Sequence, residues 1–253
     1  MMLRLALLLA LLALPLKAEE VVMGLSRDQV RINTTFEGSE ILVFGAVKRE
    51  APIPEQPLDV IVTIAGPSKP LTVRRKERVL GIWVNTDSVG IDAAPSFYAV
   101  AASAPLSEVL SNVEDLRHKI SINSAIRSVG APASIKDAQA FTDALIRIRM
   151  RQNAYQILEG AVSLEEQTLF RVAFELPANL TEGEYRTRIF LTRGGEVVSQ
   201  YETGIDVRKV GLERWLFTMS REQAMLYGLM SLAIAIVAGW SASAVFRMMR
   251  QGG

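Results

Sequence analysis

The residues best suited to chemistry form a run of cations, Arg74, Arg75, Lys76 and Arg78, interrupted only by Glu77. Such a group can bind an anion, for example sulfite, a sulfonate or a lipid phosphate. Glu77 offsets part of the charge, so a solvated hairpin tip is the competing interpretation. We expect either an anion-binding or partner-binding turn at 74–78 or an ordinary exposed one.

A second candidate group combines aromatic and polar side chains that follow this turn. Its members are Trp83, Asn85, Ser96, Phe97 and Tyr98. Aromatic rings with a few polar groups make good binding surfaces. The competing interpretation places Trp83 in the core of an alternating strand. A hidden enzymatic site would have to use Arg75, Asn85, Ser96 and Tyr98.

A third group of cations, Arg147, Arg149 and Arg151, lies in a segment with helical periodicity. Residues 147 and 151 share one face of a helix, and Arg149 does not. Asp143 is spaced to pair with Arg147. We expect a solvated helix face here.

No established catalytic or metal-binding motif occurs in the chain. His118 is the only histidine, it lies among charges near a helix end, and there is no cysteine. Nucleophile-elbow, zinc-protease, P-loop and dinucleotide-binding patterns are missing. We therefore expect no enzyme, no metal and no cofactor. The net charge of +1 also argues against nucleic acid as a partner.

The C-terminal segment predicts a membrane anchor. Residues 224–246 contain no charge, and Arg247 and Arg250 follow at once. A helix of this length extends about 34 Å, enough to cross a bilayer core. Trp215 and Phe217, just before it, suit an interfacial aromatic belt.

The predicted transmembrane helix also carries a strip of small residues. Ser231, Ala235, Gly239 and Ser243 recur every four positions. This spacing lets two helices approach closely, so we expect contact with a partner membrane protein as well as with lipid. The alternative is a helix that only anchors the chain.

The N-terminus has the pattern of a signal peptide, residues 1–18. Arg4 precedes an apolar run of about ten residues, and Ala18 offers a small residue at the cleavage point. An uncleaved anchor is the alternative. Removal of the signal predicts a periplasmic domain at 19–210, a juxtamembrane segment at 211–223 and a cytoplasmic tail at 247–253, in the bacterial inner membrane.

The exported part reads as strands, then helices, then strands. We expect a half-buried strand at 58–64, a hairpin of 71–75 and 79–85 around Lys76-Glu77, and a hairpin across Gly194-Gly195. Residues 170–176 alternate as a strand does. Tyr185 follows Gly183 with the spacing of a tyrosine corner, in which the hydroxyl bonds to upstream backbone.

A helical insert is expected at about 106–153. One helix would present Leu106, Val109, Leu110, Val113 and Leu116 on one face. A second would begin at Ser134-x-x-Asp137 and bury the residues Ala138, Phe141, Leu145, Ile148 and Tyr155. The resulting fold class is mainly β: an immunoglobulin-like β-sandwich with a helical insert, plus one C-terminal transmembrane helix. Two small β domains flanking a helical hairpin are the alternative.

Several segments resemble an alphaproteobacterial family of transmembrane proteins of unknown function. The stretches are residues 74–85 (RRKERVLGIWVN), 95–99 (PSFYA), 176–179 (LPAN), 183–185 (GEY), 209–214 (KVGLER) and 226–228 (LYG). The resemblance implies an inner-membrane protein with a periplasmic domain, and an association with permeases of the sulfite-exporter type. It supplies no catalytic residues.

The expected function is that of a membrane-anchored periplasmic binding or accessory protein that assists a membrane partner, such as an anion permease. Two alternatives stay open. One is a periplasmic enzyme with an unrecognised site, and the other is a self-associating envelope assembly protein, which would form homo-oligomers.

Overall fold

The computed structural model of the chain describes residues 19–32, 38–49, 54, 56–128, 135, 137–209 and 212–251. The predicted signal peptide, residues 1–18, lies outside them. The described residues form two compact units. The first contains those up to Val30 and those from Gly38 to Arg208. The second contains Arg31, Ile32 and the residues from Lys209 onward.

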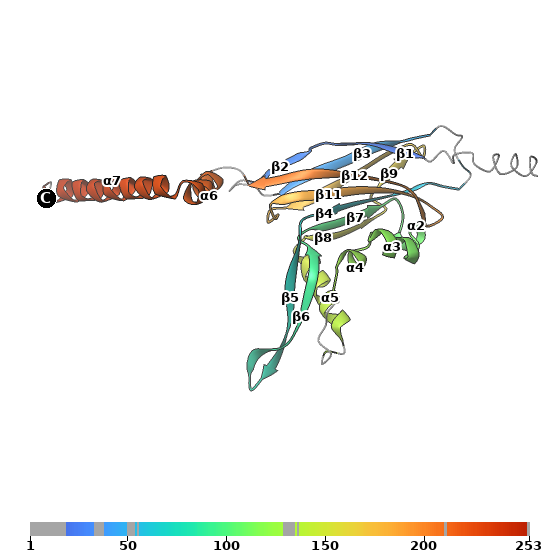
Figure 1. Cartoon of the computed structure of the whole chain (residues 1–253), viewed down its shortest axis with the longest axis horizontal. Coiled ribbons are helices and arrows are strands. Elements are labelled where there is room, and N and C mark those ends of the chain that lie inside the picture. Colours follow the sequence, from blue (N-terminus) through green and yellow to red (C-terminus); the bar gives the residue numbers. More distant parts are fainter. Residues whose placement is uncertain are drawn as a thin grey trace, which may run out of the picture. The chain divides into compact units, whose positions relative to one another are not determined.

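The first unit is mainly β, as the sequence predicts, and its sheets lie in layers (Figure 1). A four-stranded sheet has the order β1 (Glu20–Leu25), β3 (Gly38–Lys48), β10 (Leu169–Pro177), β9 (Ser163–Glu165). A six-stranded sheet has the order β2 (Gln29–Ile32), β12 (Glu196–Lys209), β11 (Gly183–Arg193), β4 (Asp59–Ala65), β7 (Tyr98–Ala102), β8 (Tyr155–Glu159). The strands β5 (Ser68–Val79) and β6 (Ile82–Pro95) form a separate two-stranded ribbon.

Strand β4 is buried on both faces, so the prediction of a half-buried strand is wrong. Val60, Val62 and Ile64 point to one side, and Ile61 points to the other. Ile61 belongs to the same apolar cluster as Ile120 and Leu145, which come from the helical insert. The insert therefore covers the face that an isolated sheet would leave in water.

The insert lies between β7 and β8, which pair in parallel. Its helices are α2 (Leu106–Val109), α3 (Asn112–His118), α4 (Ile122–Ala125) and α5 (Ala138–Arg151). Parallel neighbours need a long crossover connection, and the insert supplies it.

A single helix across 106–116 was the wrong prediction. Leu110 is extended, with φ −141°, and Ser111 starts a new helix by accepting a hydrogen bond from the Glu114 amide. Serine favours this N-cap position over a helix interior. As a result Val113 and Leu116 are exposed, at 65% and 72%.

Helix α5 begins at Ala138. The sequence predicted a capping box of Ser134 and Asp137 at its start, but Ser134 lies outside the described residues. Phe141 and Leu145 are buried as expected. Ile148 is 47% exposed, and Tyr155 belongs to β8, because the helix ends at Arg151.

The later strands agree with their sequence patterns. Alternate residues of β10 are buried, and β11 and β12 meet across Gly194 and Gly195, both at positive φ. The Tyr185 hydroxyl donates to the Thr181 carbonyl at 2.9 Å, as a tyrosine corner requires.

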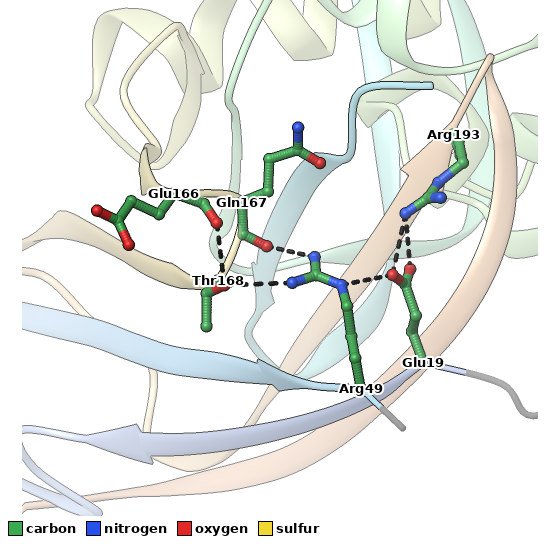
Figure 2. A network of polar contacts seen from close by, with 6 residues as sticks. All are labelled: Glu19, Arg49, Glu166, Gln167, Thr168 and Arg193. Atoms are coloured by element: carbon green, nitrogen blue, oxygen red, sulfur yellow. Dashed lines mark hydrogen bonds and ion pairs between the residues drawn. The ribbon is translucent and has the colours of Figure 1, made fainter. Parts of the chain in front are cut away.

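A partly buried ion triad of Glu19, Arg49 and Arg193 joins the N-terminal end of the described chain to both sheets (Figure 2). Both Glu19 oxygens lie 3.0 Å from Arg193 Nη2. Arg49 also donates to Thr168 Oγ1 at 3.2 Å and to the Gln167 carbonyl. Arg193 ends β11, whereas Arg49 and Thr168 lie beside β3 and β10, so the triad ties the two sheets together.

The second unit contains α6 (Leu212–Glu222) and α7 (Ala224–Gln251). Residues Ala224–Ser243 of α7 are long and apolar enough to cross a membrane, with a mean hydropathy of 1.7. This confirms the single apolar C-terminal helix expected from the sequence.

Candidate binding site on the β5–β6 hairpin

The base of the β5–β6 hairpin is held by α5, which lies beside it (Figure 1). Val89 and Ile91 are buried on the ribbon, and Leu71 and Val73 pack against the same apolar cluster. These four residues alternate along their strands, so they share one face of the ribbon. The proximal half of the hairpin is therefore part of the core.

Arg75 lies at the outer end of the part of the hairpin that packs against α5. Its guanidinium lies 4.7 Å from the centre of the Phe141 ring, hydrogen bonds to Asp137 and lies 3.6 Å from Asp87. The hydrogen bond to Asp137 raises the pKa of Arg75 above its ordinary value. Arg75 thus acts on the fold and is not free to hold a ligand.

A β-bulge follows directly. Arg75 pairs with Asp87 but Lys76 pairs with Asn85, so Thr86 is the extra residue. Beyond this bulge every residue from Lys76 to Thr86 is exposed. The distal half of the ribbon projects away from both sheets (Figure 1).

The turn of the hairpin is Leu80-Gly81, so the prediction of a turn at Lys76-Glu77 is wrong. Strand β5 continues to Val79, and the cationic run lies on this strand instead of at its tip. Leu80 has φ 50° and Gly81 has φ 87°. Positive φ at both central residues is the pattern of a type I′ turn, which matches the twist of a two-stranded ribbon.

The hairpin tip, residues 79–84, consists of apolar residues around Gly81, and all are exposed. The exposed fractions are Val79 46%, Leu80 100%, Ile82 66%, Trp83 68% and Val84 37%. Placing Trp83 in the core was the wrong interpretation. Trp83 is 68% exposed because, among the described residues, no second layer covers the ribbon there.

The cations are arranged behind this tip. Arg78 lies opposite Trp83 and Lys76 opposite Asn85, and all four side chains are exposed. Arg74 is exposed as well. Among the described residues, no carboxylate lies within 4.0 Å of the Arg74, Lys76 or Arg78 side chains. Arg78 Nε donates to the Gly81 carbonyl at 3.4 Å. The cationic run therefore divides into one structural residue, Arg75, and three cations with no carboxylate partner among the described residues, which we call the free cations.

Tyr98 does not join this group, contrary to the sequence prediction. It is 1% exposed, and its hydroxyl donates to the Ile120 carbonyl at 2.7 Å. Phe97 is equally buried, with its ring centre 6.1 Å from that of Tyr185. Both residues belong to the core beside β7 because β4 and the insert enclose this strand.

A polar pocket of about 400 Å³ is lined in part by Tyr98, and the sequence did not predict it. Its charged lining residues are Lys119, Glu184, Arg186, Arg188 and Glu202. Arg186 Nε lies 3.1 Å from Glu202 Oε1, and Arg188 donates to the carbonyls of His118 and Lys119. Most of these charges are thus already engaged within the protein. The proposed enzymatic residues Arg75 and Asn85 do not line this pocket.

A family model described as "Putative transmembrane protein (Alph_Pro_TM)" matches residues 20–248. The chain belongs to this family. The match includes the hairpin tip and most of α7, and it confirms the resemblance seen in the sequence.

A comparison with curated proteins finds no match. The sporulation control protein Spo0M from Bacillus subtilis is 12% identical, with a TM-score of 0.29. The alignment covers 82% of this chain and 56% of that one, so this chain spans little more than half of Spo0M.

The other residues singled out in the sequence make contacts within the fold or lie exposed on it. His118 ends α3, and its Nε2 lies 3.3 Å from Oε2 of the buried Glu114. Asp143 accepts a hydrogen bond from Gln139 instead of pairing with Arg147. Arg147 and Arg151 are exposed, as expected of a solvated face. Within the described residues, no cluster of three or more acidic or histidine side chains could hold a metal.

The small-residue strip lies within the apolar part of α7. Its four positions, Ser231, Ala235, Gly239 and Ser243, share one face because they are spaced by four. Ser231 satisfies its hydroxyl within the helix, donating to the Tyr227 carbonyl at 2.9 Å. A helix partner would therefore meet small side chains without an unsatisfied donor from Ser231.

Proposed function

We propose that the protein is a membrane-anchored binding or accessory protein, with α7 as its anchor and the distal β5–β6 hairpin as its binding element. One observation carries the proposal: Leu80, fully exposed, stands at the end of a ribbon whose last six residues are apolar or glycine. Contiguous exposed apolar groups of this kind mark interaction sites. Burying a Leu or similar side chain in an occupant contributes about 1.5–3 kcal/mol.

A photocrosslinking amino acid placed at Leu80 tests the proposal in intact cells. We expect it to form adducts with a component of the envelope, either protein or lipid. The same probe at Val113, 65% exposed on α3, is the matched control. If Leu80 forms no more adducts than Val113, the hairpin is not a binding element.

The finer topology is also part of the proposal. A signal peptide at residues 1–18 would be removed. The chain would then span the bacterial inner membrane, with the domain at 19–210 in the periplasm and residues 247–253 in the cytoplasm. Arg247 and Arg250 support this direction by the positive-inside rule. The Tyr185–Thr181 hydrogen bond supports an immunoglobulin-like arrangement of the strands.

The small-residue strip of α7 is proposed as the contact with a membrane partner, and an anion permease is the partner that the family resemblance suggests. Leucine at both Ala235 and Gly239 should remove that partner on purification in mild detergent. Leucine at Ala233 and Ser241, about half a turn away, should not. If the variant with leucine at Ala235 and Gly239 retains every membrane partner, α7 serves only as an anchor.

Two other functions have distinguishable consequences. An enzyme would use the polar pocket beside Tyr98, and its activity would depend on Arg186 and Arg188 and not on Leu80. A self-associating assembly protein would give Leu80 crosslinks to a second copy of the chain. The exposed tip favours binding over catalysis, because it places apolar groups in water where no reactive group accompanies them.

A further inference from the structure

We infer that the hairpin tip inserts into the interface of a lipid bilayer that carries anionic headgroups. The inference rests on the proposed role of the hairpin as the binding element and names what it binds. Three features of residues 74–84 and one of the whole chain support it.

The first feature is the shape and chemistry of the tip. A partner protein would have to provide a deep apolar groove for a convex, two-stranded end that carries large apolar side chains on both faces. Arg78 and Trp83 share one face, and Val79, Ile82 and Val84 share the other. A bilayer accepts apolar groups from all sides. Trp83 also has the amphipathic ring that prefers the headgroup level.

The second feature is the conformation of Leu80. At φ 50° the chain favours Gly, Asn or Asp, and a leucine there is unfavourable. Its side chain contacts nothing that would compensate, since it is 100% exposed. Strained residues of this type tend to occur at functional positions. A leucine held at the outermost point of the ribbon is well placed to enter an apolar phase first.

The third feature is the spacing of the free cations. At about 3.3 Å per strand residue, Arg78, Lys76 and Arg74 lie roughly 7, 13 and 20 Å behind Leu80. Interfacial segments bury their apolar groups to a depth of about 5–10 Å. Insertion of the tip to that depth would bring Arg78 and Lys76 to the lipid phosphates, where each cation attracts anionic headgroups.

The fourth feature is the continuity of the chain with α7. A domain tethered to a membrane span samples the bilayer at a high effective concentration, so a weak second contact suffices. A short apolar tip with a few cations is suited to such a contact, whereas it would hold a free protein poorly.

The test uses the full chain reconstituted in vesicles, with Trp215→Phe and Trp240→Phe leaving Trp83 as the only indole. The vesicles contain either phosphatidylcholine alone or phosphatidylcholine with phosphatidylglycerol. Brominated acyl chains report contact with lipid, and acrylamide reports contact with water. In anionic vesicles we expect bromolipid to reduce Trp83 emission roughly twofold, as for an indole at the interface, with weak quenching by acrylamide.

The variants separate the contributions. Lys76→Glu with Arg78→Glu should abolish the bromolipid effect, whereas Arg147→Glu with Arg151→Glu, two exposed cations on α5, should leave it unchanged. Leu80→Asn should reduce it while keeping the fold. Equal quenching in both vesicles and in the charge-reversed hairpin would overturn the role assigned to the cations.

The outcome also separates this inference from the proposal beneath it. If Trp83 is quenched only by acrylamide but Leu80 crosslinks to a protein in cells, the hairpin binds a protein and the lipid assignment is wrong. If Trp83 is quenched only by acrylamide and Leu80 forms no specific adduct, both the lipid assignment and the binding role fail.

Discussion

Glu19 and Arg49 form a buried ion pair, in which Arg49 Nε lies 2.6 Å from Glu19 Oε1 and the side chains are 15% and 9% exposed, respectively. Glu19 also neutralises Arg193. We predict that Glu19→Gln lowers the free energy of unfolding by about 2–4 kcal/mol, because it leaves two largely buried guanidinium groups without a counter-ion. Urea unfolding of the full chain in detergent, followed by the β-sheet circular dichroism, measures this.

The neighbouring residue provides the control. Glu20 pairs with Lys48 at 3.5 Å, but both side chains are more than half exposed. Glu20→Gln should therefore change stability by less than about 1 kcal/mol. Similar losses for the two variants would contradict a special role for the buried triad.

Leu80→Asn should stabilise the protein by about 0.5–1 kcal/mol, because asparagine tolerates the left-handed conformation that leucine resists. No folded-state contact is lost, since Leu80 is fully exposed. Thermal unfolding checks the sign. A variant that is less stable than the parent would show that Leu80 packs against something in the folded domain.

Gly81→Ala should destabilise the hairpin by about 1 kcal/mol, because φ 87° suits glycine alone. A Cβ at this position would meet no atom within 4 Å, so the cost would come from the backbone only. Gly90→Ala is the matched control, because its Cβ is equally unobstructed and its φ is not in the left-handed region. Equal effects at both glycines would argue against the left-handed turn.

Asp115 ties together the connection between α3 and α4. Burial favours the protonated form of Asp115, but hydrogen bonds from Ser121, Ser124 and the Ile120 amide outweigh it and lower the pKa below its ordinary value. These include Ser121 N at 2.6 Å and Ser124 Oγ at 2.7 Å. Asp115→Asn should cost about 2 kcal/mol at neutral pH.

The pH dependence follows from the direction of that shift. A carboxylate with a lowered folded pKa stabilises the protein above its unfolded pKa, about 3.9, and loses this contribution as the pH falls through the folded value. The parent should thus approach the stability of Asp115→Asn below about pH 4. Asp143→Asn, which removes an exposed carboxylate, should show little change. A constant difference between parent and Asp115→Asn down to low pH would contradict the prediction.

Tyr155 contributes to the loss of stability at alkaline pH. Burial raises the pKa of its hydroxyl to about 12, and the hydroxyl donates to the Pro95 carbonyl at 2.9 Å. Stability from this group is complete below the unfolded pKa of about 10 and is lost as the pH rises toward 12. Tyr155→Phe should cost about 1 kcal/mol at neutral pH and flatten the alkaline loss. The phenolate absorbance measures the ionisation, with the exposed Tyr201→Phe as control.

Sequence patterns predicted the elements whose signal is local. Phe170 and Phe174 alternate with exposed residues, and two consecutive glycines mark the turn at 194–195, so no tertiary information was needed. The prediction of one helix at 106–116 was wrong because the spacing of apolar residues stays the same when a helix is interrupted. Ser111 is compatible with both a helix interior and an N-cap, so its residue type did not reveal the interruption. The hairpin turn was misplaced because Leu80 is an unusual residue at positive φ, whereas Lys76-Glu77 has the polarity of a turn.

The candidate sites were predicted only in part. The cationic run and the aromatic Trp83 were visible as residues, but their exposure depends on where α5 ends its contact with the ribbon. The ion triad brings Glu19 to Arg193, 174 residues apart, and beside the pocket Arg188 donates to the carbonyl of His118, 70 residues away. These long-range contacts depend on how the strands pair across the whole domain. The local sequence around each residue therefore does not predict them.

The position of Glu19 would matter for the proposed removal of the signal peptide. If the leader is removed after Ala18, as proposed, Glu19 becomes the first residue of the mature chain. A peptidase that cut one bond later would delete the central carboxylate of the triad and leave Arg49 and Arg193 without it. Molecules cut at the wrong bond would then unfold more readily and be degraded first. The stability of the fold would in this way select for correctly processed chains.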